Sequence, residues 1–266
     1  MKKHVDFTLQ DGIAVITMDS PPVNAFTDAL HDDFRSTLAT LAGQTVRVAI
    51  VTGTDKYFQA GGDMNRFLTL KTLADARAFV ELAQDFMNSL AATPYPTIAA
   101  INGYALGGGL EIALACDIRV ASTNAVLGLP EARYGILAGA GGTQRLARLV
   151  GAGRAKFMMY TGRQLTAGQA LDFGLVEQVS APEQLLTDSM AMAREIAGNS
   201  PIAVRHIKHC VDEGLDLSLE RALALERDYW AGLIPYGDYL EGVRAWLEKR
   251  LPDYPDIPAP PQTTAL

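Results

Sequence analysis

The chain has 266 residues, of which 48% are apolar and 20% are charged, and its formal net charge is −7 at neutral pH. This length suits one large globular domain, with or without a smaller appended unit. The negative balance argues against nucleic acid or an anionic membrane surface as the main partner, although a local basic cluster can still bind a small anion. No stretch reaches the ~20 apolar residues that a membrane helix needs.

The cysteines and the first residues indicate the compartment. The start of the chain, MKKHVDFTLQ, lacks the apolar run of a signal peptide. Cys116 and Cys210 lie in apolar or helical surroundings, and we expect both to be buried and reduced. These features predict a cytoplasmic protein.

The first half of the chain alternates between predicted strands and helices. The turn sequence QDG at 10–12 separates two runs that predict a β-hairpin, 5–9 and 13–18. Thr27 can cap a helix that continues to about residue 41. Short apolar runs predict strands at 46–52, 97–101 and 118–121, and helical spacing predicts helices at 75–90 and 111–115. This alternation predicts a sheet with helices packed over it.

The second half is predicted to be almost entirely helical. The expected helices are 142–150, 152–160, 167–173, 182–198, 201–213, 217–231 and 237–249. Only residues 176–179 predict another strand. The tail, LPDYPDIPAPPQTTAL, is rich in proline, and we expect an extended or disordered arm there.

Three glycine-rich segments follow predicted strands or apolar stretches. They are DKYFQAGGDM at 55–64, INGYALGGGLE at 101–111 and GLPEARYGILAGAGGTQRL at 128–146. Glycines at such junctions let backbone N–H groups approach a ligand, and helix N-termini favour negative charge. Two junctions facing each other would form an oxyanion hole. Each segment alone also fits a tight turn or close helix–strand packing, and none contains the dinucleotide motif G-x-G-x-x-G.

Two glutamates accompany these glycines. Glu111 follows the triple glycine, and Glu131 follows Pro130 after one short helix and one strand, which is enough chain to return to the same pocket. A pair of carboxylates can act as general acid and base, or can hold a water between them. A cap or a solvated helix face is the alternative for either one. His206 and His209 lack further ligands at metal-site spacing, so no metal site is predicted.

At these residues the sequence resembles the crotonase superfamily, the enoyl-CoA hydratase/isomerase family. The similarity runs from about residue 5 to 250 and is most specific in AGGDM at 60–64, NGYALGGGLE–ALACD at 102–117 and LPEARYGILAGAGGTQRL at 129–146. The resemblance implies an α/β fold with a ββα spiral core over 1–195. It also implies a helical C-terminal region over 196–266 that mediates assembly into a trimer, often a dimer of trimers.

The resemblance assigns roles at the reacting centre. The backbone N–H groups of Gly62 and Gly108 would form an oxyanion hole for a thioester carbonyl. Glu111 would orient and deprotonate the attacking water, and Glu131 would exchange the proton at C2. The N–H of Gly139 would help to position that water.

It also implies a binding site for coenzyme A. The implied contacts are Lys56 at the nucleotide phosphates, the backbone around Ala60, Gly62, Asp63 and Met64 at the adenine end, and Trp246 and Lys249 from a neighbouring subunit.

The implied reaction is hydration of a 2-enoyl-CoA to the 3-hydroxyacyl-CoA, because hydratases of this family carry both glutamates and isomerases typically carry one. No metal or redox cofactor is implied, and coenzyme A is part of the substrate. Other reactions of the superfamily stay open: isomerisation of the double bond, hydration with carbon–carbon cleavage, and decarboxylation. A non-enzymatic RNA-binding relative fits the acidic balance poorly.

The chain departs from the family pattern around the acyl and coenzyme A sites. SPPVNAF lacks a basic residue that is common there, and Asn65 stands where some relatives have lysine. Ala138 replaces a proline, and Arg133 and Tyr134 add bulk near the second acid. These differences leave the acyl group open.

The ionisation state of Glu111 depends on two opposing effects. The residue lies in the first turn of a predicted helix, where the dipole favours the charged form, whereas burial favours the neutral form. We expect the dipole and water contacts to keep it ionised.

Overall fold

The computed structural model describes residues 3–257 and contains two β-sheets covered by helices. Its strands are β1 (Val5–Gln10), β2 (Ile13–Met18), β3 (Val48–Gly53), β4 (Tyr57–Gln59), β5 (Thr97–Ile101), β6 (Tyr104–Leu106), β7 (Ile118–Ser122), β8 (Val126–Gly128), β9 (Gln164–Thr166) and β10 (Gln178–Ser180). The larger sheet has the order β1-β2-β3-β5-β7-β10, and the smaller has the order β4-β6-β8-β9.

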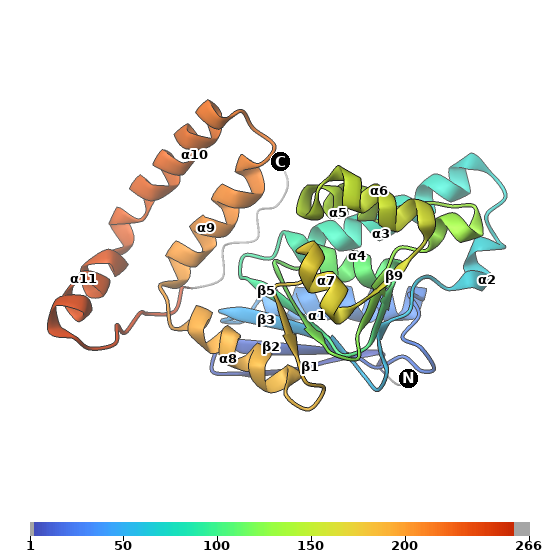
Figure 1. The fold of residues 1–266 in the computed structure, drawn as a ribbon. Coiled ribbons are helices and arrows are strands. Elements are labelled where there is room, and N and C mark those ends of the chain that lie inside the picture. Colours follow the sequence, from blue (N-terminus) through green and yellow to red (C-terminus); the bar gives the residue numbers. More distant parts are fainter. Residues whose placement is uncertain (1–2, 258–266) are drawn as a thin grey trace.

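The helices surround these sheets and continue beyond them (Figure 1). They are α1 (Asp28–Ala42), α2 (Met64–Phe67), α3 (Leu73–Ala91), α4 (Gly108–Ala115), η1 (Glu131–Tyr134), α5 (Gly142–Val150), α6 (Ala152–Thr161), α7 (Ala167–Phe173), α8 (Leu185–Ala197), α9 (Pro201–Gly214), α10 (Leu219–Gly232), η2 (Ile234–Tyr236) and α11 (Asp238–Glu248). Thr27 caps α1 as predicted, because its side chain accepts a hydrogen bond from the Leu30 N–H at 3.2 Å.

The larger sheet is buried on both faces. β1 and β2 form the predicted antiparallel hairpin, and the remaining neighbours in the sheet pair in parallel. Along β3, Ala49 and Val51 join the main hydrophobic core, whereas Val48 and Ile50 pack with α8 on the other face. Such two-sided burial accounts for the continuous apolar runs in the sequence.

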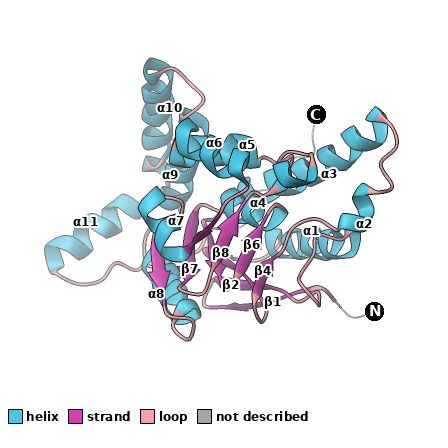
Figure 2. Ribbon diagram, turned by 45° about the vertical axis from the view of Figure 1, so that its right-hand side comes forward, coloured by secondary structure: helices cyan, strands magenta, loops and turns pink. Residues whose placement is uncertain are grey.

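The core repeats a strand–strand–helix unit, as the resemblance implied. In each unit the first strand enters the larger sheet, the second enters the smaller sheet, and a helix follows: β3–β4–α2, β5–β6–α4 and β7–β8–η1. Figure 2 shows β4, β6 and β8 side by side. The second strand of each unit therefore delivers the chain to the same edge of the small sheet, and this places the three glycine-rich segments close together.

The sequence-based assignment missed the smaller sheet. All four of its strands have three residues, and no element was predicted at the position of β9. The predicted strand at 176–179 is observed two residues later, at Gln178–Ser180. The helices predicted from residue 142 onward are all present, with ends that differ by up to three residues.

Helices α9 to α11, here called the arm, project away from the sheets in both views (Figures 1 and 2). Ile202 is the only buried residue of α9, and α10 has none. The division of the chain into units at residues 195 and 196 stays a prediction. The predicted extended tail is free of helix and strand as far as residue 257, and its residues 258–266 lie outside the described part.

The cysteines are both free, as expected, but only Cys116 is buried, and Cys210 is half-buried on α9. Among residues 3–257, no helix combines the length and apolarity that crossing a membrane requires. Within the same range, His, Cys, Asp and Glu side chains form no group of three or more that could hold a metal ion.

Candidate active site

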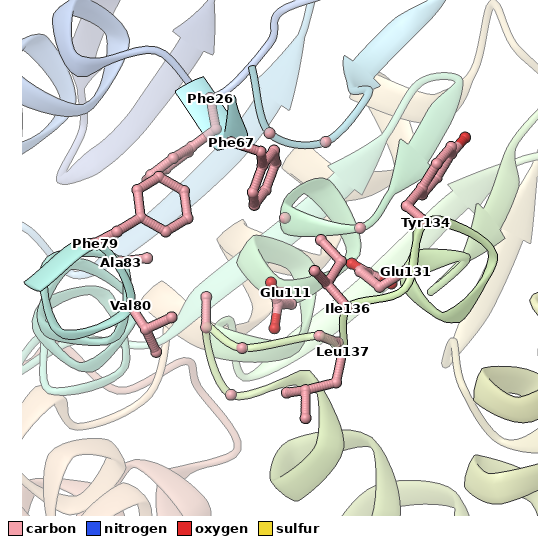
Figure 3. A pocket seen from close by; sticks show the side chains of 18 of the residues that line it. Phe26, Phe67, Phe79, Val80, Ala83, Glu111, Glu131, Tyr134, Ile136 and Leu137 are labelled. Atoms are coloured by element: carbon pink, nitrogen blue, oxygen red, sulfur yellow. The ribbon is translucent and has the colours of Figure 1, made fainter. Parts of the chain in front are cut away.

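A cavity of about 920 Å³ lies where the three glycine-rich segments meet α3 (Figure 3). Residues 60–64, 106–108 and 130–144 contribute most of one wall, and α3 supplies the other. The glycines and acids singled out from the sequence lie in its lining: Gly62, Gly108, Glu111, Glu131 and Gly139. The structure therefore brings these predicted residues to one place.

The triple glycine forms the sharp entry into α4. Gly107 has φ 53° and ψ −123°, a conformation that strongly favours glycine. A Cβ atom at Gly109 would lie 2.0 Å from the backbone oxygen of Gln59, so only glycine allows the helix to approach β4 this closely. Gly108, the first residue of α4, keeps the free N–H of a helix N-terminus.

A second junction, at Gly61 and Gly62, faces the first. The Gln59 side chain fixes it, because its Oε1 accepts from the Gly61 N–H at 2.8 Å and its Nε2 donates to the Gly61 carbonyl at 3.1 Å. Gln59 is fully buried. Sequence reasoning missed this residue, and its one signal was an amide at the end of an otherwise apolar strand.

The two junctions present backbone donors to the cavity. Within residues 3–257, neither the Gly62 nor the Gly108 N–H donates a hydrogen bond to another protein group. Backbone N–H groups without a hydrogen-bond acceptor destabilise the folded protein when they are buried. The same groups stabilise an oxyanion that binds between them. This arrangement can hold a carbonyl oxygen.

Glu111 is 4% exposed and lies one turn into α4. Its Oε1 accepts from the Gly142 N–H at 2.8 Å, at the start of α5. Burial raises the pKa of the Glu111 carboxyl to about 7, although the Gly142 N–H lowers it. The helix dipole and water contacts were expected to keep Glu111 ionised, whereas its burial favours the neutral form and outweighs the effect of the Gly142 N–H.

Glu131 opens the short helix η1 and is half-buried. A Cβ at Gly107 would lie 2.8 Å from Glu131 Oε1, so the carboxyl group rests against the glycine turn. Its Oε2 atom is buried and has no hydrogen-bond partner among residues 3–257. Burial also raises the pKa of Glu131. Its negative charge in turn raises the pKa of Glu111.

Two further side chains, which sequence reasoning missed, hold the loop at residues 139–140. Gln84 on α3 donates to the Gly139 carbonyl at 2.7 Å. Arg145 on α5 donates to Asn88 Oδ1 at 2.8 Å and to the Ala140 carbonyl at 3.3 Å. The Arg145 charge also lowers the pKa of Glu111. Both residues tie residues 139–140 to α3, which fixes the position of the Gly139 N–H.

The residues predicted to contact coenzyme A are divided between two regions. Ala60, Gly62 and Met64 line the cavity, whereas Asp63 caps α2 by accepting from the Asn65 N–H at 2.9 Å, and Lys56 is exposed outside the lining. Trp246, 78% exposed, and Lys249 belong to α11 and its C-terminal cap. Both views place α11 on the opposite side of the molecule from α2, so Trp246 and Lys249 lie far from the cavity of their own chain (Figures 1 and 2).

The departures from the family pattern have different consequences. Tyr134 and Ala138 line the cavity. Arg133 adds no bulk there, because its guanidinium donates to the Thr161 carbonyl at 3.4 Å and packs against Gly162. Of these three residues, only Tyr134 and Ala138 therefore affect the shape of the cavity.

Comparison with known proteins assigns the chain to a family. Residues 8–257 match the sequence model of the enoyl-CoA hydratase/isomerase family. The crotonyl-CoA hydratase of Syntrophomonas wolfei is 39% identical and the 2,3-dehydroadipyl-CoA hydratase of Escherichia coli is 38% identical, over 91% and 92% of this chain and 94% and 96% of theirs. The crystal structure of an enoyl-CoA hydratase from Bacillus anthracis superposes with a TM-score of 0.90 at 37% identity, covering 97% of this chain and all of that one. The chain belongs to the enoyl-CoA hydratase/isomerase family of the crotonase superfamily.

Proposed function

We propose that the protein adds water to a 2-enoyl-CoA thioester and forms the 3-hydroxyacyl-CoA. The observation that carries this proposal is the placement of two carboxyls, both with a raised pKa, in one cavity with two unpaired glycine N–H groups. The acids can manage the two proton transfers of the reaction, and the donors can hold the negative charge that develops between them.

The oxyanion hole binds the thioester oxygen. The N–H groups of Gly62 and Gly108 donate to this oxygen, which gains negative charge as water attacks C3. Removing one such donor typically costs about 3 kcal/mol of transition-state stabilisation. No metal or redox cofactor takes part, because the conjugated thioester already provides the electron sink.

The two glutamates then share one proton. In the hydration direction Glu111 is ionised and takes a proton from the water, while the water oxygen bonds to C3. Glu131 is protonated and gives its proton to C2. A single proton shared by neighbouring carboxyls is the expected state of such a pair, because two adjacent negative charges repel. Gly139, held by Gln84, donates its N–H to the water.

Coenzyme A occupies the open side of the cavity in this proposal. Ala60, Gly62 and Met64 receive the adenine end, and Asp63 keeps that segment in place by capping α2. Lys56 pairs with the nucleotide phosphates.

We further propose that the arm completes this site by self-association into a trimer or a dimer of trimers. Exposed apolar side chains on the arm favour such burial: Ile207, Val211, Leu215, Leu219, Leu223, Trp230 and Trp246. Trp246 and Lys249 then reach the coenzyme A site of a neighbouring copy.

The test is turnover of crotonyl-CoA, followed by the loss of the ultraviolet absorbance of the conjugated thioester and by identification of the product. We expect 3-hydroxybutyryl-CoA from the wild type and a rate lower by about 10²–10⁴ in Glu131→Gln. A shifted double bond, a cleaved carbon chain or released carbon dioxide would assign another reaction of the superfamily. Near-normal turnover by Glu131→Gln would show that Glu131 is not the acid of the reaction.

A further inference from the structure

The cavity wall opposite the glutamates indicates which acyl group the enzyme takes. The related hydratases named above act, by their names, on a four-carbon and on a six-carbon dicarboxylic acyl group, so family membership leaves this open. The following inference rests on the proposed hydratase function and adds the class of substrate.

One side of α3 forms an apolar stripe along the cavity. Ala76, Phe79, Val80, Ala83 and Met87 recur at helical spacing and all line it. From Val80 to Met87 the stripe covers about 10 Å along the helix axis. Figure 3 shows Val80 and Ala83 on this wall, facing the loop that carries Leu137.

The stripe begins beside the proposed reaction centre. A Cβ atom at Gly139 would lie 3.4 Å from Val80 Cγ2, and Gln84, on the next position of α3 after Ala83, holds the Gly139 carbonyl. Carbon atoms beyond C3 of a bound substrate therefore leave the glutamates along α3. Along this path the α3 side chains in the lining are apolar except for Gln84.

Aromatic residues close the same cavity near its α2 side. Phe67 and Phe79 contact each other edge to face with centroids 5.2 Å apart, and Phe26 lies beside them (Figure 3). The total volume of about 920 Å³ is near the upper end for small-molecule pockets. Ala60, Gly62 and Met64 of this cavity belong to the proposed coenzyme A site, so the acyl chain uses only the part that lies along α3.

The charge of the lining excludes an acidic acyl terminus. Among the lining residues, all of which lie in the described part of the chain, there is no Lys, Arg or His, and the acids are Glu111 and Glu131. The nearby Arg145 is already bound to Asn88 and to the Ala140 carbonyl. A carboxylate on the far end of the acyl chain would be buried there without a cation.

We infer that the substrate of this enzyme is a 2-enoyl-CoA with an uncharged, apolar acyl chain longer than four carbons, which lies against the α3 stripe. Each additional methylene buried there strengthens transition-state binding roughly fourfold until the wall is covered. A carboxylate at the end of the acyl chain cancels this strengthening of transition-state binding.

The test compares kcat/KM for 2-trans-enoyl-CoA substrates of four, six, eight and ten carbons and for a six-carbon substrate with a terminal carboxylate. We expect the eight-carbon substrate to exceed the four-carbon one by at least tenfold. We expect the carboxylate to lower kcat/KM at least 100-fold relative to its methyl-ended six-carbon counterpart. A preference for four carbons, or equal rates with and without the carboxylate, would overturn the inference.

A pair of variants tests the wall itself. Ala83→Leu fills the stripe, whereas Ala78→Leu places the same side chain on an exposed position of the same helix. The ratio of kcat/KM for eight and four carbons should fall at least tenfold in Ala83→Leu and stay unchanged in Ala78→Leu. An unchanged ratio in both variants would show that the acyl chain lies elsewhere.

Binding of saturated acyl-CoA thioesters, measured by calorimetry, separates this inference from the proposed reaction. Tighter binding of octanoyl-CoA than of butyryl-CoA without turnover of any enoyl-CoA would leave the wall assignment standing and overturn the hydratase function. Equal binding of both would overturn the wall assignment even in an active hydratase.

Discussion

The core and the arm differ in how far their apolar side chains are buried. In the core, the strands of the larger sheet are covered on both faces by side chains of the same chain. In the arm, most apolar side chains are exposed, and two polar contacts join α9 to the core. Arg205 donates to the Pro94 carbonyl at 3.2 Å, and Lys208 pairs with Asp117.

The cavity and the exposed apolar surface therefore belong to different regions of the chain. Every residue that lines the cavity comes from positions 26–164, and the arm contributes none of them in its own subunit. The core therefore supplies the whole lining of the cavity, and in the proposed assembly the arm acts on a neighbouring subunit. Substitutions in the core should lower kcat, whereas substitutions in the arm should affect assembly and KM.

The largest effect is expected in the core, at Glu111. Glu111→Gln keeps the shape of the side chain and the acceptor for the Gly142 N–H but cannot take a proton. We expect kcat to fall by about 10²–10⁴, with little change in KM. Combined with Glu131→Gln, the loss should be much smaller than the product of the single losses, because the two groups act as a unit. Steady-state kinetics of the three variants measures this, and full additivity would contradict a shared role.

The same substitution should stabilise the protein at alkaline pH. A folded-state pKa raised from 4.5 to about 7 means that Glu111 contributes its full stability below pH 4.5 and loses it as the pH rises through 7. Relative to the wild type, Glu111→Gln should gain about 3 kcal/mol in unfolding free energy at pH 8 and almost nothing at pH 4.5.

Urea unfolding at a fixed protein concentration measures this gain, and the exposed Glu220→Gln is the matched control. A Glu111→Gln variant that is no more stable than the wild type at pH 8 would show that ionised Glu111 does not destabilise the folded protein.

Changes in the arm should affect assembly and substrate binding and spare the chemical step. Val211 is 52% exposed and Leu223 is 49% exposed, so Val211→Asp with Leu223→Asp places charges on the proposed subunit contact. We expect sedimentation to show monomers and KM for the thioester to rise roughly tenfold, as Trp246 and Lys249 of a neighbour are lost. Glu220→Gln again serves as the control. Unchanged sedimentation would place the subunit contact elsewhere.

The smallest effect is expected at Lys56, which is exposed. Lys56→Ala should raise KM for coenzyme A thioesters about two- to fivefold at low salt and less at high salt, because the contact is a solvent-screened ion pair. A pantetheine thioester, which has no nucleotide, should be unaffected. Lys156→Ala, at another exposed lysine, is the control, and an equal effect there would point to overall charge.

Much of the core could be predicted because its information is local. The hairpin, β3, β5 and the helices from α5 onward follow from apolar runs and helical spacing within each segment. The smaller sheet could not be predicted, because its strands of three residues are defined by pairing with distant segments. The exposure of the arm depends on where α8 ends and on the direction taken by α9, which no local pattern encodes.

The candidate site was predictable to a similar extent. The glycines and both glutamates stand out by residue type, and they do line one cavity. Arg145 did not stand out, because its acceptor Asn88 is brought near by the fold. Gln59 did not stand out, because its two hydrogen bonds to Gly61 depend on how the chain turns after β4. The raised pKa of Glu111 could not be predicted for a related reason, since desolvation depends on the surrounding atoms, which the sequence does not place.

The most direct test of the account is the position of the hydrogen that Glu131 delivers. Hydration of crotonyl-CoA in deuterated water, followed by mass spectrometry and NMR of the product, locates the new deuterium. We predict one deuterium at C2 and a hydroxyl group at C3 for the wild type, with C2 labelling lost in step with turnover in Glu131→Gln. Deuterium at C4, or C2 labelling at the wild-type rate in that variant, would contradict the assignment of Glu131 as the acid of a hydratase.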